Sequence, residues 1–273
     1  MGPNALGSTE DQEDTQSILI QHNTKDGRLY MKHRQLPTAK RPGVEGLFEQ
    51  AMALGVRVPG KLGYIARRKL KRRQCARMTD TFAQVLADTG AGDLCIDLGA
   101  NVGDITRDLA ATGAEVISFE PDPGAFEALK AATSGLANVT LVPKAVGHQK
   151  DSLLLRRSCK WSPDDPAGHT EGSSIVHHDQ GTDDTNSIMV EVIDIIAFLV
   201  ELDRDIRILK MDIEGAEWDI LTRLIDHPVL QRVDCIFVET HERQDPAKYV
   251  PIFEALQNCA EQIQRPYINL YWV

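Results

Sequence analysis

The sequence predicts an α/β protein with an open, mostly parallel β-sheet and helices on both of its faces. Two observations carry this prediction. From about residue 79, short apolar runs alternate with helical patterns, which is the order typical of a parallel sheet. The apolar run 93–98 also ends in a glycine turn that leads directly into a helix, a connection common at the ligand crevice of such sheets. The chain has 273 residues, of which 42% are hydrophobic and 26% charged, and this composition suits a globular protein.

The part before residue 79 differs in composition and lacks the alternation of strands and helices. Residues 1–45 are polar and rich in Gly and Pro, and we expect a flexible arm there. A short helix is expected over 44–54, and a helix rich in Lys and Arg over 62–78. The predicted organisation is therefore a flexible arm at 1–45, a basic helical extension at 46–78 and one α/β domain at 79–273.

Within the α/β domain, strands and helices follow one another in a regular order. The strands are expected at 93–98, 115–119, 139–142, 153–155, 188–192, 206–211, 233–238 and 268–273. The helices are expected at 102–111, 123–135, 216–225 and 246–262, the second and fourth of them starting with an Asp-Pro pair. The segment 156–187 is a long loop rich in Ser, Asp, Gly and His. It includes His177, His178 and Asp179, and we interpret it as a lid over the substrate.

Composition and charge exclude several classes of protein. The five cysteines form no CxxC pair, which favours the reducing cytoplasm over a disulfide scaffold or a zinc site. The longest apolar stretch, 192–200, is too short to span a membrane, and the first residues lack the apolar centre of a signal peptide. The net charge of −10 divides into +7 for 1–80 and −17 for 81–273. The larger part therefore repels polyanions such as nucleic acids.

The strongest chemical signal is the segment CIDLGANVGDIT at 95–106. Gly99 and Gly103 carry no Cβ, so a ligand can lie against the backbone where the helix begins. Asp97 can accept hydrogen bonds there, and Glu120 at the end of the second strand is placed to bind a ribose diol. The GxGxxG fingerprint is absent and carboxylates flank the loop. A cationic nucleoside without phosphate, S-adenosylmethionine, therefore fits better than a dinucleotide.

Four segments together make a resemblance specific: DLGANVG, SFEPDP, NVTLVPKAVG and LKMDIEGAEWDIL. Over about residues 80–262 the chain resembles the FkbM-type family of S-adenosylmethionine-dependent methyltransferases. The resemblance implies a class I methyltransferase (Rossmann-like) fold and O-methylation of a hydroxyl on a sugar, polyketide or other small metabolite. Such folds usually end with two strands after the last helix, whereas only one is predicted here.

The resemblance also implies a cofactor site. Its residues are Asp97, Gly99, Ala100, Asn101, Gly103, Glu120, Pro121, Lys144, Ala145 and Asp212. The glycine loop with Asp97 would line the methionine end, Glu120 the ribose, and the Lys144-Ala145 pair the adenine.

The acceptor site is expected at the ends of the strands 206–211 and 233–238, because the carboxyl ends of parallel strands face the ligand crevice. Asp212 and Glu214 are predicted to orient the acceptor hydroxyl, or to hold a divalent cation such as Mg²⁺, with Asp212 and Glu239 as the metal pair. His241 is the candidate general base, because an imidazole with a pKa near ~6.5 accepts a proton at neutral pH. Glu217 has two interpretations, a functional residue or a cap of the following helix.

The basic stretch 61–77 also leaves alternatives open. It is either a solvated helix face, which we prefer, or a contact for anionic lipid, phosphate-bearing substrate or nucleic acid. A nucleic-acid substrate is disfavoured, because neither an Asn/Asp-Pro-Pro-aromatic segment nor a Pro-Cys pair occurs. Two other functions remain as alternatives: an inactive methyltransferase-like binding module and an NAD-linked oxidoreductase. The sequence does not fix an oligomeric state.

Overall fold

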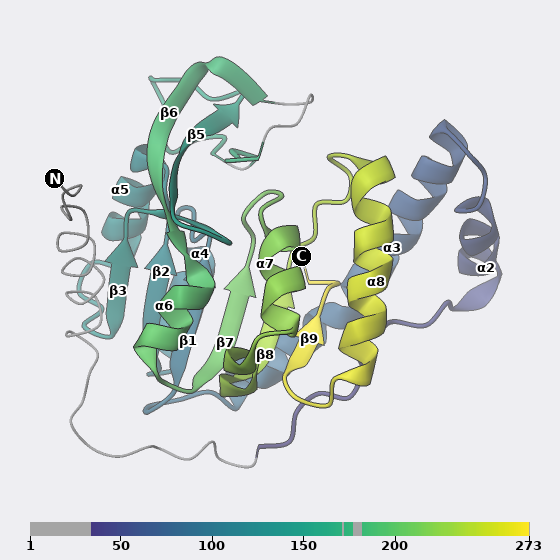
Figure 1. Ribbon diagram of the computed structural model, residues 1–273, viewed down its shortest axis with the longest axis horizontal. Helices are drawn as coiled ribbons and strands as arrows, with labels where there is room; N and C mark the ends of the chain where they lie inside the picture. Colours follow the sequence, from purple (N-terminus) through teal and green to yellow (C-terminus); the bar gives the residue numbers. More distant parts are fainter. Residues whose placement is uncertain (1–33, 171, 177–181, 273) are drawn as a thin grey trace, which may run out of the picture.

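A computed structural model describes residues 34–170, 172–176 and 182–272. At its centre lies a six-stranded sheet with the order β3-β2-β1-β7-β8-β9, in which every neighbouring pair is parallel (Figure 1). Its strands are β1 (Leu94–Leu98), β2 (Glu115–Phe119), β3 (Val139–Val142), β7 (Ile206–Met211), β8 (Val233–Val238) and β9 (Tyr267–Asn269). The chain changes direction along the sheet between β1 and β7, which opens a crevice at their carboxyl ends.

Helices cover both faces of this sheet, so the predicted Rossmann-like α/β fold is confirmed. All five residues of β1 are buried, and alternate side chains point to opposite faces. Ile96 belongs to the apolar cluster that contains the helices of one face, whereas Cys95 packs with the helices of the other. The first face carries α6 (Ile195–Leu202), α7 (Glu217–Ile225) and α8 (Pro246–Gln262); the second carries α3 (Lys61–Ala87) and α4 (Asp104–Ala111).

A second, three-stranded sheet stands above the carboxyl ends of the large one (Figure 1). It consists of β4 (Ala145–Gly147), β5 (Asp151–Ser158) and β6 (Thr182–Asp194). The strands β5 and β6 are antiparallel and longer than the predicted 153–155 and 188–192. The helix α5 (Pro123–Ala132) follows β2, and its cap Asp122 also accepts a hydrogen bond from Arg157 Nε of β5 at 2.6 Å. This bond joins the two sheets.

Three elements are absent from the sequence prediction: β4, α6 and a short 3₁₀ helix over Pro228–Arg232. The apolar run that contains α6 has no polar periodicity, because five of the eight α6 residues are buried. Its start signal is Asp194, whose side chain accepts from the backbone N–H groups of Ile196 and Ala197. The last strand is shorter than expected because Asn269 Oδ1 accepts a hydrogen bond from the N–H of Tyr271 and turns the chain.

The N-terminal extension is a pair of packed helices, α2 (Gly46–Gly55) and α3. The helix α3 is longer than the predicted 62–78 and continues without a break to Ala87. Glu49 is buried between the helices, where Arg77 and Arg73 bind its carboxylate at 2.6 and 3.0 Å. These bonds, with Arg77 contributing most, lower the pKa of Glu49 to about 2. In the described part of the chain, none of the helices is long and apolar enough to cross a bilayer.

Candidate active site

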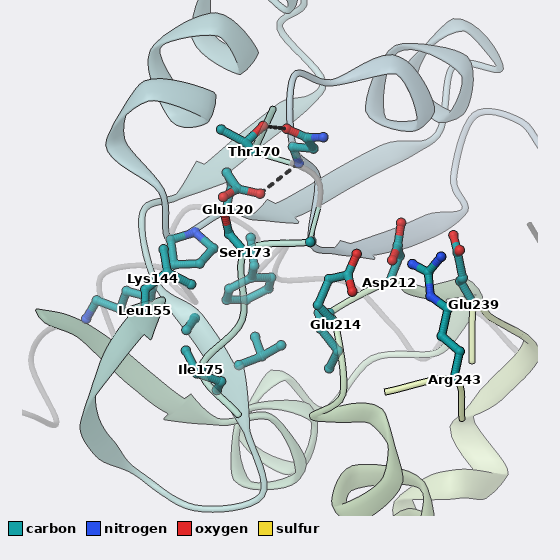
Figure 2. Close-up of a pocket in the computed structure, with 18 residues that line it drawn as sticks. Glu120, Lys144, Leu155, Thr170, Ser173, Ile175, Asp212, Glu214, Glu239 and Arg243 are labelled. Atoms are coloured by element: carbon teal, nitrogen blue, oxygen red, sulfur yellow. Dashed lines mark hydrogen bonds between the residues drawn. The ribbon is translucent and has the colours of Figure 1, made fainter. Parts of the chain in front are cut away.

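A cavity of about 530 Å³ lies at the carboxyl edge of the large sheet, under the small sheet. The ends of β1, β2, β7 and β8 line its floor. Its other wall is lined by β4, β5 and four residues that precede β6: Thr170, Gly172, Ser173 and Ile175. Figure 2 shows Glu120, Lys144 and Leu155 on one side and Asp212 and Glu239 on the other. The cavity thus has two halves that are built from different parts of the chain.

Most of the residues that the sequence nominates lie in the wall of this cavity. They are Gly99, Asn101, Glu120, Pro121, Lys144, Ala145, Asp212, Glu214 and Glu239. Four nominated residues lie behind the wall instead: Asp97, Ala100, Gly103 and His241. In the predicted lid, Ser173 lines the cavity and Ser174 Oγ donates to the carbonyl of Glu214. His177, His178 and Asp179 lie outside the described residues.

Glu120 is the buried carboxylate of the left half of the cavity in Figure 2. Its Oε2 accepts a hydrogen bond from the N–H of Asn101 and its Oε1 from the N–H of Asp122, both at 2.8 Å. Each oxygen therefore keeps a lone pair for a further donor. Burial raises the pKa of Glu120 to about 7, against the opposing effect of these two hydrogen bonds.

Around Glu120 the wall is mostly apolar, which suits a flat nucleobase. Phe119, Val146, Leu155 and Ile175 lie in this part of the cavity wall. Lys144 Nζ forms an ion pair with Glu191 at 2.9 Å, which holds the lysine stem along the wall. Asn101 is fixed from the lid side as well, because Thr170 Oγ1 donates to its Oδ1 at 2.6 Å (Figure 2).

Asp97 lies below the cavity floor and is completely buried. Lys210 Nζ forms an ion pair with Asp97 Oδ1 at 3.0 Å, and Thr106 Oγ1 donates to Oδ2 at 2.7 Å. Lys210 also donates to the carbonyl of Gly99 at 2.7 Å. Burial alone would lower the pKa of Lys210, but the carboxylates of Asp97 and Asp212 raise it. Asp97 therefore fixes the glycine loop through Lys210 instead of facing the cavity.

Glycine is required at the two positions of the loop for different structural reasons. Gly99 has φ +78°, and a Cβ there would lie 1.8 Å from the backbone oxygen of Asp212. Only glycine allows the loops after β1 and β7 to approach so closely. Gly103 has φ +96°, and its Cβ would lie 2.7 Å from Leu129 Cδ1, so this glycine permits the packing of α4 against α5.

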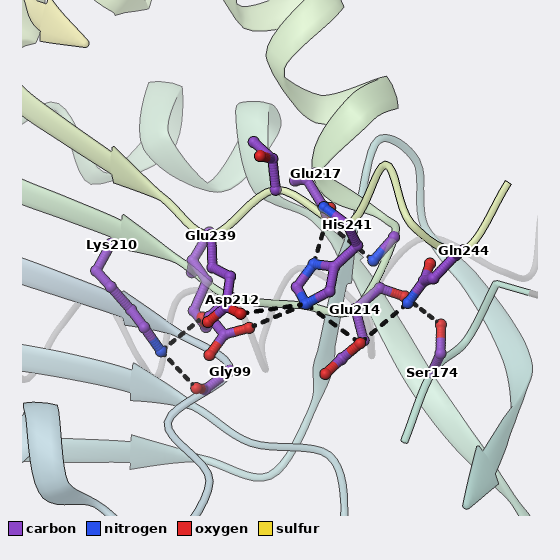
Figure 3. Close-up of polar contacts among 12 residues, drawn as sticks. Gly99, Ser174, Lys210, Asp212, Glu214, Glu217, Glu239, His241 and Gln244 are labelled. Carbon is purple, nitrogen blue, oxygen red and sulfur yellow. Dashed lines mark hydrogen bonds and ion pairs between the residues drawn. The ribbon is translucent and has the colours of Figure 1, made fainter. Parts of the chain in front are cut away.

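The right half of the cavity is an acidic cluster around one buried histidine, drawn in Figure 3. His241 is 1% exposed, and its Nδ1 lies 3.0 Å from Glu217 Oε1. Its Nε2 lies 3.2 Å from Glu214 Oε2, 3.8 Å from Asp212 Oδ1 and 3.9 Å from Glu239 Oε1. Glu217 is itself fixed because Oε2 accepts from the N–H of Gly215 at 2.7 Å.

These contacts set the charges of the cluster. Burial would lower the pKa of His241, but the hydrogen bonds to Glu214 and Glu217 raise it well above the ordinary value. The imidazole thus has a carboxylate beside each ring nitrogen, which favours its protonated form over the neutral form that a general base requires. Burial raises the pKa of Glu239 to about 6, with a further contribution from the charge of Asp212. Burial also raises the pKa of Asp212, whereas the hydrogen bond from His241 outweighs burial and lowers that of Glu214.

The cluster also has the donor set of a metal site. Asp212, Glu214 and His241 each offer one ligand atom, and these atoms lie within 4.8 Å of one another. Asp212 and Glu214 are candidate cation ligands from the sequence, whereas the third member of this set is His241 and not the predicted Glu239. A nitrogen ligand suits Mn²⁺, Fe²⁺ or Zn²⁺ better than Mg²⁺, which prefers oxygen.

Sequence reasoning misses Lys210, Thr170, Arg243 and Gln244. Arg243 lines the cavity, and Gln244 Nε2 donates to Glu214 Oε2 at 3.0 Å. Lys210 has a sequence signal: like Arg207, it is a cation inside an otherwise apolar strand, and a buried cation requires a carboxylate partner. The other three lie in loops, where nothing in the pattern marks them.

The family model described as Methyltransferase FkbM domain matches residues 97–267. No curated protein matches the chain. A solved structure of methyltransferase FkbM from Methylobacillus flagellatus KT is 18% identical, with a TM-score of 0.30. That match covers 50% of this chain and 31% of the other, so this chain spans about a third of the solved protein's length.

Proposed function

Because the chain belongs to the FkbM methyltransferase family, we propose that it transfers a methyl group from S-adenosylmethionine to a hydroxyl oxygen of a small molecule. The observation that carries the proposal is the division of the cavity into two halves. An apolar wall with one buried carboxylate, Glu120, faces an acidic cluster that contains Asp212 and Glu239.

The charge of the cavity supports this cofactor. The wall carries four carboxylates, Glu120, Asp212, Glu214 and Glu239, against Lys144 and Arg243. A cationic sulfonium is attracted to such a wall, and a pyrophosphate is repelled, which disfavours an NAD-linked oxidoreductase. Glu120 would accept hydrogen bonds from the ribose hydroxyls, while the apolar wall near Leu155 would hold the adenine. When bound, the cofactor supplies a methyl group already activated by positively charged sulfur.

The acidic cluster would supply the proton acceptor. As the acceptor oxygen forms its bond to the methyl carbon, the carbon–sulfur bond breaks and the hydroxyl proton must leave. Glu239 lines the cavity and has a pKa of about 6, so it is ionised at neutral pH and basic enough to take the proton. His241 would hold the carboxylates in place as a buried cation, and the protein would mainly position the two reactants.

A divalent cation is a second arrangement for the same cluster, favoured by the ligand geometry of Asp212, Glu214 and His241. In that arrangement these three residues would hold the ion, which would supply a Lewis acid able to lower the pKa of a nearby hydroxyl. Treatment with EDTA distinguishes the two. Loss of turnover that Mn²⁺ or Mg²⁺ restores would identify the metal arrangement. Unchanged turnover would support the arrangement in which the protonated imidazole of His241 balances the charge of the carboxylates.

The function is tested with isotope-labelled S-adenosylmethionine and pools of sugars, polyketides and other hydroxyl compounds, with mass spectrometry of the products. A labelled product whose label resists mild acid and base, as an ether methyl does, is expected. Label on nitrogen or carbon would contradict O-methylation. Binding of S-adenosylhomocysteine without any product would favour an inactive binding module, and binding of NAD alone would contradict the cofactor.

We expect the affinity for S-adenosylhomocysteine to rise with pH through about 7. The raised pKa of Glu120 means that the carboxyl is protonated in the free protein below pH 7, whereas ribose hydroxyls need the ionised form as acceptor. Below pH 7, each pH unit should therefore weaken binding up to ~10-fold. Calorimetry from pH 5.5 to 8.5 measures this, and proton release on binding should accompany it.

In Glu120→Gln the pH dependence should disappear and binding should be weak throughout; a slope that persists would show that another group titrates. The stability of the free protein depends on pH in the opposite direction to the affinity for S-adenosylhomocysteine. Its Glu120 takes up a proton on folding, so this residue stabilises the fold below the ordinary pKa of a glutamate, and the contribution is lost as pH rises through about 7.

A further inference from the structure

The two N-terminal helices expose an unusual amount of apolar surface. Eleven large hydrophobic side chains are exposed in the described part of the chain, and eight of them fall between Val44 and Ile65. Leu47 is 85% exposed, Leu54 67% and Leu62 70%. Scattered single exposed residues are ordinary, but a concentration of this kind marks an interaction surface.

Helical spacing groups these side chains. Leu47 and Leu54 are seven residues apart on α2, and Leu62 and Ile65 are three apart on α3, so each pair lies on one face of its helix. The opposite face of α3 is buried through residues such as Met78 and Val85. Figure 1 shows α2 and the first half of α3 at one end of the molecule, beyond α8.

Basic side chains accompany the apolar ones. Arg57, Lys61, Arg68, Lys69 and Arg72 are all exposed. Within the ranges that the structure describes, no carboxylate pairs with any of these five. By contrast, Lys71 and Arg77 are bound to Glu242 and Glu49 inside the fold. The outer face thus combines apolar side chains with unpaired positive charge, while the body of the protein is acidic.

We propose that this face, defined by residues 44–72 and called here the α2–α3 face, binds an anionic membrane surface. Leucine and isoleucine side chains enter the boundary between headgroups and acyl chains, and Lys and Arg contact the lipid phosphates. A nucleic acid offers the phosphates but no place for Leu47, Leu54 and Leu62. A second copy of the chain would bring two positively charged faces together. An anionic membrane matches both components of the surface.

The proposal goes beyond methyl transfer, and its test does not depend on activity. The full chain is mixed with vesicles of phosphatidylcholine alone, or with phosphatidylglycerol in a molar ratio of about 2:1, and bound protein is measured by flotation. Binding to the anionic vesicles, weakened by salt, is expected. Binding no stronger than to neutral vesicles would overturn the proposal.

Two variants test the two components separately. Leu47→Ser with Leu62→Ser removes apolar contacts, and its control is Met189→Ser with Val200→Ser, exposed apolar residues elsewhere. The second variant removes positive charge by changing four residues to Gln: Lys61, Arg68, Lys69 and Arg72. Its control is Arg107→Gln with Lys130→Gln.

Each test variant should lower the partition coefficient at least about 100-fold, whereas the controls should bind like the wild type. Unfolding temperatures near that of the wild type show that the variants remain folded. Three other results would overturn the proposal. The first is normal vesicle binding by the test variants. The second is a wild-type dimer that does not bind vesicles and that dissociates in Leu47→Ser with Leu62→Ser. The third is binding to RNA without binding to vesicles.

Discussion

Glu239→Gln is expected to lower kcat by ~10²–10⁴-fold, the usual contribution of a positioned proton acceptor. Glutamine keeps the shape of the side chain in the cavity wall but cannot take a proton. Glu239 lies across the cavity from the apolar wall near Leu155 (Figure 2), so the affinity for S-adenosylhomocysteine should change little. Steady-state turnover and calorimetry of the same preparation measure the two quantities.

The pH profile of kcat separates Glu239 from His241. In the wild type, kcat should fall as pH drops below about 6, because Glu239 becomes protonated. His241→Gln removes a positive charge that lowers the pKa of Glu239, so the fall should move to higher pH while activity at high pH survives. If His241→Gln abolishes turnover at every pH and Glu239→Gln does not, the histidine is the base after all.

Asp97→Ala is expected to destabilise the fold by ~3–5 kcal/mol, because it leaves the ammonium of Lys210 buried without its partner. Both side chains are at most 3% exposed. Lys210→Met should have a similar cost, since it leaves the Asp97 carboxylate unpaired. The double variant should recover part of the loss, because two apolar side chains need no partner. Urea unfolding followed by circular dichroism measures all three.

The control is Lys130→Ala, which breaks the exposed pair with Glu127 and should cost less than about 1 kcal/mol. An Asp97→Ala variant with wild-type stability and no affinity for S-adenosylhomocysteine would contradict this role. Asp97 would then be a direct ligand of the cofactor, as the glycine-loop pattern on its own suggests.

Glu120 and Asp97 illustrate what the sequence can and cannot predict. Asp97 is the second-last residue of β1 and Glu120 directly follows β2, and strand ends at one edge of a parallel sheet are predictable from periodicity alone. The difference between them depends on Lys210, which pairs with Asp97 across neighbouring strands. That register joins residues more than a hundred positions apart, and no local pattern reports it.

His241 shows the same limit in its electrostatics. Its place after β8 follows from the strand pattern, but its charge depends on Glu214 and Glu217, which follow β7. An isolated histidine is neutral at pH 7, so a prediction from its own neighbourhood gives a base. The small sheet is also unpredicted in part, because its strand β4 has only three residues.

Lys71 has a consequence for how the two ends of the molecule communicate. From the α2–α3 face side of the fold, its ammonium binds Glu242 and donates to the carbonyl of Thr240, next to Glu239 and His241. The single helix α3 therefore carries both the outer surface and an ion pair to the loop that follows β8. If the α2–α3 face binds a membrane as proposed, this helix would also fix how the cavity is oriented relative to the lipid surface.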